Sequence, residues 1–142
     1  MTAQEGLALA LTIVFSLTLL AMFVAGFGLI LSKIGGWGKL ANHYRARKAF
    51  PKPGWWFQSA GMGVVRYNFI IKAAADADGI YILPMFPLRL SHAPLFIPWD
   101  DIEIEPGTNF LSAWEYRFAK DKQIKFKVGN TLHERLIGAR QA

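Results

Sequence analysis

The residues whose side chains could carry chemistry are few and far apart in the chain. There is no cysteine, so a thiol nucleophile and a disulfide are both excluded. The three histidines, His43, His92 and His133, lie in separate segments without a second ligand at metal-binding spacing. Gly61-Met62-Gly63 is not followed by the Lys-Ser/Thr of a phosphate-binding loop. We therefore expect no enzyme activity, no cofactor, no bound metal and no small-molecule substrate.

An acidic run, Asp101, Glu103 and Glu105, is the densest group of carboxylates. At the two-residue period of a strand, the three side chains project from one face. Basic residues in the segment 122–127 could lie opposite them. We expect an exposed ladder of charges here rather than a metal or acid–base site, because cross-strand pairs of opposite charge are a common solvated arrangement.

A smaller polar group, Arg89, Ser91 and His92, lies in a proline-flanked loop. These side chains could hold a small anion. The simpler interpretation, which we favour, is that their polar atoms are satisfied locally within the loop.

The element that positions everything else is the apolar stretch Gly6 to Ser32, which contains no charged residue and no proline. As a helix it would be roughly 40 Å long, against about 30 Å for the hydrocarbon core of a bilayer. The preceding MTAQEG has no basic residue, and the apolar stretch is longer than the roughly 7 to 15 residues of a signal peptide. The sequence predicts a retained transmembrane helix over 6–32.

The flanking charges predict the orientation. Six basic and no acidic residues lie between Lys33 and Lys52, and none is basic before the span. Basic residues stay on the cytoplasmic side, so we expect residues 1–5 outside and the remainder in the cytoplasm. These six charges equal the whole net charge of +6. The basic excess is thus a collar at the membrane, and nucleic-acid binding is not expected.

Small residues line one side of the predicted span, which would let another helix approach closely. The predicted helix-packing residues are Ala21, Ala25, Gly28 and Ser32. The alternative is that glycine and alanine are simply common in membrane helices.

The segment 33–54 is predicted to hold a short amphipathic helix in the plane of the interface, ended by Pro51 and Pro53. It would bind anionic phospholipid, or merely determine topology and anchor the chain. The predicted headgroup and interface residues, including two tryptophans just beyond the segment, are Trp37, Lys39, Tyr44, Arg45, Arg47, Lys48, Lys52, Trp55 and Trp56.

Residues 55–142 show short alternating segments separated by turns, typical of an antiparallel sheet or partly open barrel. The pattern Thr131-x-x-Glu134 is a capping box and predicts the start of a short C-terminal helix. The expected fold class is a membrane-anchored α+β protein with one transmembrane helix, a small antiparallel β domain and this helix.

Antiparallel strands closed by a C-terminal helix resemble the pleckstrin-homology-like (PH-like) fold and its GRAM-type bacterial relatives. The run 79–102, GIYILPMFPLRLSHAPLFIPWDDI, is similar to a segment of small membrane-anchored bacterial proteins, as is GWGKLANHY at 36–44. The matching positions are Leu88-Arg89, His92-Ala93-Pro94, Ile97-Pro98-Trp99 and Ile102. The resemblance implies a bacterial inner membrane and, by fold analogy, lipid or protein binding, but no activity.

The loop 84–99 is long, proline-rich and apolar. Exposed apolar patches of this kind mark interaction sites, although the same residues could complete a small core. The predicted partner-contact residues are Met85, Phe86, Leu88, Leu90 and Phe96.

Two functions are compatible with these features. The favoured one is a non-catalytic accessory or scaffolding subunit of a larger bacterial membrane complex, such as a respiratory or photosynthetic one, with other transmembrane proteins as partners. The alternative is a free-standing module that binds anionic lipid through the basic segment and the PH-like domain.

Overall fold

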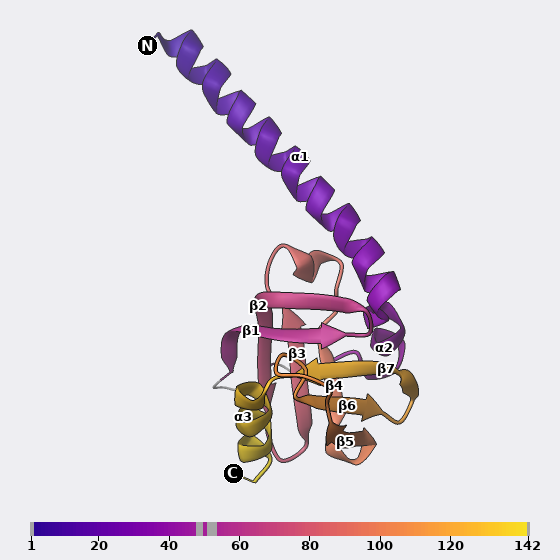
Figure 1. The fold of residues 1–142 in the computed structure, drawn as a ribbon. Helices are drawn as coiled ribbons and strands as arrows, with labels where there is room; N and C mark the ends of the chain where they lie inside the picture. Colours follow the sequence, from indigo (N-terminus) through magenta and orange to yellow (C-terminus); the bar gives the residue numbers. More distant parts are fainter. Residues whose placement is uncertain (1, 48–49, 51–53, 142) are drawn as a thin grey trace.

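A long N-terminal helix leads into a small β domain (Figure 1). The structure, a computed structural model, describes residues 2–47, 50 and 54–141. Helix α1 (Ala3–Gly35) runs for 33 residues without a break. At its start, the Thr2 side chain accepts a hydrogen bond from the Glu5 amide, and the Glu5 carboxylate accepts one from the Thr2 amide. Among the described residues, α1 is the one helix long and apolar enough to cross a membrane.

A tight corner joins α1 to α2 (Trp37–Tyr44). Gly36 forms the corner with a φ of 85°, a left-handed conformation that glycine adopts without steric cost. A side chain at Gly36 would also collide with Ile124, and one at Gly35 would lie 2.9 Å from the Met62 carbonyl oxygen. These glycines therefore allow close packing of α1 on the domain.

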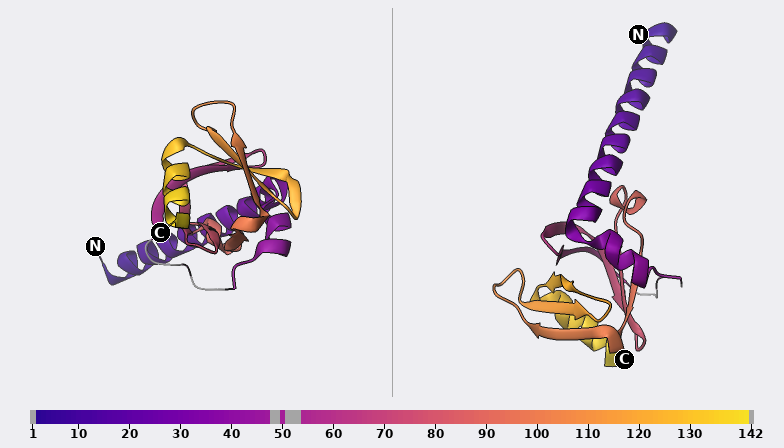
Figure 2. Two further views of the ribbon diagram at one scale, coloured as in Figure 1. Left: turned by 90° about the horizontal axis from the view of Figure 1, so that it is seen from below. Right: turned by 90° about the vertical axis from the view of Figure 1, so that its right-hand side faces the viewer.

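The sheet has seven antiparallel strands in the order β4-β3-β2-β1-β7-β6-β5. It curls into a nearly closed barrel, seen along two directions in Figure 2. The strands are β1 (Trp55–Met62), β2 (Val65–Ala75), β3 (Gly79–Pro84), β4 (Leu95–Pro98), β5 (Ile102–Pro106), β6 (Trp114–Phe118) and β7 (Asp121–Val128). The predicted antiparallel β domain is thereby confirmed.

Helix α3 (Asn130–Gln141) follows β7 and packs on the barrel through Leu132 and Leu136. It begins at Asn130, so Thr131 already lies within the helix and is not its N-cap. The predicted capping box is wrong in its register, while the predicted C-terminal helix is confirmed.

The apolar face of α2 belongs to the core of the β domain. Trp37 is 1% exposed and donates a hydrogen bond from Nε1 to the Ala93 carbonyl oxygen at 2.8 Å. Leu40 and Tyr44 are buried with it. The prediction of a helix resting this face on the membrane is wrong, because the face is packed in the core of the β domain.

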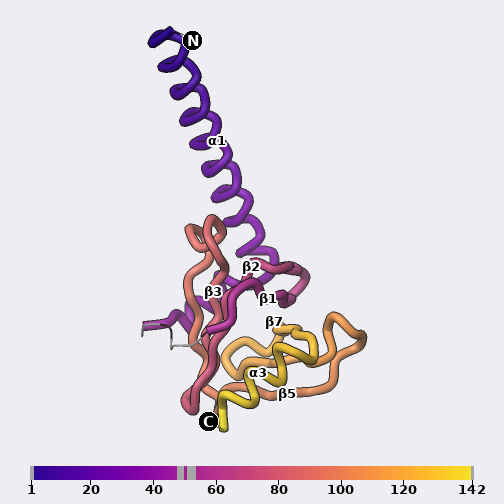
Figure 3. The backbone as a smooth tube through the Cα atoms, turned by 90° about the vertical axis from the view of Figure 1, so that its left-hand side faces the viewer, coloured from indigo at the N-terminus to yellow at the C-terminus, as the bar shows by residue number. Residues whose placement is uncertain are grey.

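The β3–β4 loop rises from the barrel and lies beside α1 (Figures 1 and 3). It contains a short 3-10 helix, η1 (Leu88–Leu90). A side chain at Gly28 of α1 would collide with the Ser91 hydroxyl and would lie 3.2 Å from Leu88 Cδ2. The helix and the domain are therefore joined both at the Gly36 corner and along this loop.

The two tryptophans Trp37 and Trp56 provide a matched test of the burial of α2. Trp37→Ala should lower the free energy of unfolding by about 3–5 kcal/mol, because it removes a fully buried ring and leaves a cavity. Trp56→Ala should change it by less than about 1 kcal/mol, because the Trp56 ring is mostly exposed. Chemical unfolding in detergent, followed by circular dichroism, measures both. Equal effects would contradict the placement of α2 in the core.

Candidate functional site

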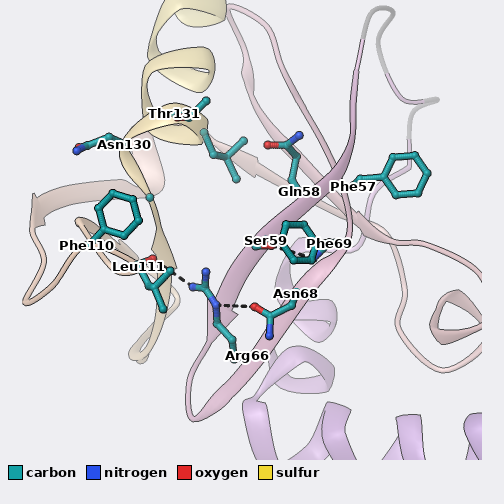
Figure 4. Close-up of a pocket in the computed structure, with 12 residues that line it drawn as sticks. Phe57, Gln58, Ser59, Arg66, Asn68, Phe69, Phe110, Leu111, Asn130 and Thr131 are labelled. Carbon is teal, nitrogen blue, oxygen red and sulfur yellow. Dashed lines mark hydrogen bonds between the residues drawn. The ribbon is translucent and has the colours of Figure 1, made fainter.

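A groove on the β domain is lined by the β1–β2 hairpin, the loop after β5 and the start of α3 (Figure 4). Its volume is about 360 Å³. Figure 4 shows Phe110 and Leu111 at one side, Phe69 at the other and Arg66 between them. Phe110 is 83% exposed and Phe69 71%. The groove thus presents large apolar side chains to its surroundings together with one positive charge.

Two phenylalanines beside the groove have an unusual backbone. Phe57 and Phe69 have φ angles of 56° and 60°, the left-handed region in which a bulky residue costs roughly 1–2 kcal/mol. Both lie where the β1–β2 pairing shifts register, between Trp55↔Ala73 and Ala60↔Tyr67. Such bulges re-aim side chains. Here they leave both rings exposed.

Arg66 is held in place at the floor of the groove. Its Nε donates to the Asn68 side-chain oxygen at 3.2 Å, and one terminal nitrogen donates to the Leu111 carbonyl oxygen at 3.2 Å. No carboxylate pairs with Arg66 among the described residues. Its guanidinium therefore keeps donors that an approaching carboxylate could use.

The acidic run is divided among several contacts rather than forming one ladder. Glu105 pairs with Arg117 at 2.6 Å, and Lys125 pairs with Glu115, a residue outside the run. Asp101 lies in a short 3-10 helix (Trp99–Asp101), not in the strand. The expected exposed ladder opposite residues 122–127 is therefore wrong in its partners, because β6 lies between β5 and β7.

Asp101 has a structural partner that the sequence did not indicate. The Tyr44 hydroxyl donates to Asp101 Oδ2 at 2.9 Å and accepts from the Lys120 amide at 3.0 Å. Burial, followed by the hydrogen bond and charge of Asp101, raises the pKa of Tyr44 to about 12. These bonds tie α2 to the turn after β6.

The histidines are placed in three separate surroundings. His43 is exposed on α2, and His133 stacks on Trp114 and bonds the Tyr116 hydroxyl at 2.8 Å through Nδ1. Within the described ranges, no three His, Cys, Asp or Glu side chains gather into a potential metal site. The hydrogen bonds of the His92 and His133 rings are made with the hydroxyls of Tyr67, Ser91 and Tyr116.

His92 is 1% exposed and links the β3–β4 loop to the core. Its Nε2 lies 2.8 Å from the Tyr67 hydroxyl, and its Nδ1 lies 3.0 Å from the Ser91 hydroxyl. The Ser91 hydroxyl donates to the Leu88 carbonyl oxygen. One neutral tautomer of His92 accounts for these hydrogen bonds: the Tyr67 hydroxyl donates to Nε2, and Nδ1–H donates to the Ser91 hydroxyl. The polar atoms of Ser91 and His92 are therefore satisfied by these hydrogen bonds. Arg89 is exposed and takes no part in them.

The predicted helix-packing face is partly used by the chain itself. Gly28 and Ser32 are buried beneath the β3–β4 loop and the α1–α2 corner. They are not free for another helix, which corrects that part of the prediction. Ala25 and Ala21, about one and two turns before Gly28, remain half-exposed.

The predicted interface residues separate into three groups. Trp37 and Tyr44 are inside the domain, so their predicted contact with lipid is wrong. The others that are described, Lys39, Arg45, Arg47, Trp55 and Trp56, are exposed or half-exposed. Lys48 and Lys52, like the predicted helix terminators Pro51 and Pro53, lie outside the described residues.

The predicted contact loop is partly core and partly surface. Leu88 packs against the core, and the Phe96 ring lies 4.7 Å from that of Tyr81. Met85 is half-buried, whereas Phe86 and Leu90 are exposed. Only these last two retain the full exposure expected of a contact surface.

Comparison of the chain with family models, with curated proteins and with solved structures found no match. The sequence does not single out the residues of this groove, called here the aromatic groove after Phe57, Phe69 and Phe110. Phe57 and Phe69 lie in segments that read as ordinary strands, and the bulges that reverse their direction leave no pattern in one sequence.

The pH dependence of stability tests the buried state of His92. Burial lowers the pKa of His92 in the folded protein below its usual value, and burial also lowers that of His133. The unfolded chain then binds more protons as the pH falls below about 6.5, so acid should destabilise the fold. We expect the free energy of unfolding to be highest above this pH and to decrease from pH 7 to pH 5.

His92→Gln should be less stable at pH 7 but should lose less stability on acidification, since one of the two responsible groups is gone. Urea unfolding in detergent at several pH values measures both slopes. An unchanged slope in His92→Gln would show that His92 does not contribute.

Proposed function

We propose that this protein is a non-catalytic accessory subunit of a membrane protein complex, anchored by α1 and binding another subunit through the aromatic groove. The observation that carries the proposal is the exposure of Phe57, Phe69, Phe110 and Leu111 around one groove. Large exposed apolar side chains gathered around one groove are typical of interaction surfaces, and aromatic residues are enriched at them.

The energetics support a binding role for these side chains. Burying one large apolar side chain contributes about 1.5–3 kcal/mol of stability. The isolated protein does not gain this full contribution from the four exposed side chains around the groove. Left-handed conformations at Phe57 and Phe69 add a cost to the fold. Glycine at either position would remove that cost, so the rings are better explained by a partner than by stability.

Arg66 defines the chemistry of the partner. Its fixed guanidinium lies between apolar walls and has donors available. The matching segment would present apolar side chains around one Asp or Glu carboxylate, because a partly desolvated arginine favours a paired carboxylate.

The proposed setting is the cytoplasmic face of a bacterial inner membrane, with the N-terminus outside. The basic residues after α1 support this orientation. The strand order and the C-terminal helix support the resemblance to the PH-like fold. Ala21 and Ala25 offer a second contact, with a transmembrane helix of the same partner.

Substitution of Phe69 separates binding from folding. Phe69→Gly should leave the free energy of unfolding unchanged or raise it by about 1 kcal/mol, because glycine relieves the left-handed strain. Phe69→Ala keeps the strain and should be less stable than Phe69→Gly. Both variants should nevertheless weaken association with the partner, because both remove the exposed ring.

The association is measured by mild detergent extraction of native membranes, native separation and mass spectrometry of what co-migrates. Trp56→Ala is the matched control, since Trp56 is exposed but lies outside the groove. Stoichiometric co-migration that is lost in Phe69→Gly and kept in Trp56→Ala supports the proposal. Migration of the wild-type chain alone, or equal co-migration of all variants, contradicts it.

A specific observation also favours the alternative, binding of anionic lipid. His43, Arg45 and Arg47 surround a hollow of about 330 Å³ next to α2. The two arginines beside this hollow suit a phosphate headgroup, each contributing about 1 kcal/mol near an anionic surface.

If this alternative holds, Arg45→Gln with Arg47→Gln should reduce the phosphatidylglycerol that co-purifies with the full chain, measured by native mass spectrometry. Lys122→Gln is the control, being exposed on β7 and outside this hollow. Equal lipid retention in both would exclude the hollow as a headgroup site.

A further inference from the structure

We infer that the segment Met85–Leu90, the outer part of the β3–β4 loop, enters the membrane beside α1 and forms a second point of contact with the bilayer. Phe86 and Leu90 are the inserted side chains, and lipid is the occupant of their exposed surface. The inference rests on α1 spanning the membrane, as proposed above, and is independent of the groove.

The contact between the loop and α1 determines the depth of the loop. Gly28 of α1 faces Ser91 and Leu88 so closely that a side chain at Gly28 would collide with the Ser91 hydroxyl. Gly28 lies about 10 Å along the helix axis before Gly35, at 1.5 Å per residue. The loop therefore extends alongside α1, from the C-terminal end of the helix toward the part proposed to span the membrane, as Figure 3 shows.

The position of Gly28 along α1 can be related to the thickness of a bilayer. A hydrocarbon core of about 30 Å takes about 20 helical residues, and centred on the uncharged stretch 6–32 these are roughly residues 9–29. Gly28 then lies at the edge of the hydrocarbon core, and Lys33 lies among the headgroups. A loop that touches Gly28 from the side is placed at this boundary.

The chemistry of the loop fits the boundary. Phe86 is 67% exposed and Leu90 63%. No acidic residue occurs from Gly79 to Trp99, so no negative side chain would meet anionic headgroups. Arg89 is exposed between Leu88 and Leu90, and its long side chain can keep the charge among the headgroups while its stem stays apolar.

The loop is held in this position by the protein. The Met85 amide donates to the Ile70 carbonyl oxygen at 2.6 Å, and His92 joins the other end of the loop to Tyr67. Leu88 packs against the core. Phe86 and Leu90 are therefore presented on a braced loop, and insertion needs no further ordering of the chain.

Site-specific fluorescence tests the position of the loop. The chain has no cysteine, so Phe86→Cys or Leu90→Cys provides a unique site for the polarity-sensitive dye NBD. Phe110→Cys is the matched control, because Phe110 is exposed and its loop lies beyond the lower end of α1 in Figures 1 and 3. The labelled full chains are reconstituted in vesicles of phosphatidylcholine and phosphatidylglycerol at 3:1.

We expect NBD at position 86, and at position 90, to emit at shorter wavelength than at position 110 and to be quenched by lipids carrying a spin label near the top of the acyl chain. Water-like emission without quenching at both loop positions would overturn the inference. The two loop sites guard against one substitution that disturbs the fold.

Alkaline carbonate extraction of the same vesicles distinguishes failure of the loop insertion from failure of the membrane anchor. Chains that resist extraction but have water-like loops refute the loop insertion and leave the anchor intact. Chains that are extracted refute the anchor, and with it both this inference and the membrane part of the proposed function.

Gly28 and Gly26 provide a second, matched comparison. Gly28→Leu should push the loop off the helix and shift the emission of NBD at position 86 toward the water-like value. Gly26→Leu should leave the emission unchanged, because nothing lies within 4 Å of a side chain built there. Identical spectra in both variants would show that the helix does not position the loop.

Discussion

The close packing of α1 on the β domain is the constraint on which the rest of the structure depends. Gly35 and Gly36 let the helix end against the β1–β2 hairpin and Ile124, and Gly28 lets the β3–β4 loop lie along the helix. A helix held at its end and at its side has little freedom to swivel. The orientation of the domain relative to α1 is therefore determined by packing rather than left to a flexible linker.

The packing of α1 on the domain places the two exposed apolar regions, the β3–β4 loop and the aromatic groove, in different surroundings. Phe86 and Leu90 are exposed on the loop that lies alongside α1, where we infer that they contact lipid. The aromatic groove lies on the barrel, between the β1–β2 hairpin, the loop after β5 and the start of α3. A surface there meets water unless a protein covers it, and its phenylalanines have a backbone conformation that works against the stability of the isolated fold.

Much of the fold could be predicted from the sequence, because alternation of apolar and charged residues is a local signal. β7, with Ile124, Phe126 and Val128 buried and Lys125 and Lys127 more exposed, follows it directly. The burial of α2 could not be predicted in the same way. An apolar face at helical spacing needs an apolar neighbour, but its sequence does not say whether that neighbour is a bilayer or a barrel.

The sequence by itself determined that one long apolar segment precedes a basic collar and a small antiparallel β domain, since length, charge and period are properties of consecutive residues. Tertiary structure alone decided where Trp37 is buried, what Gly28 touches and which way Phe57 and Phe69 point. Those outcomes depend on contacts between segments more than 30 residues apart, as between Trp37 and Ala93, and on bulges that reverse a side chain without altering the pattern around it.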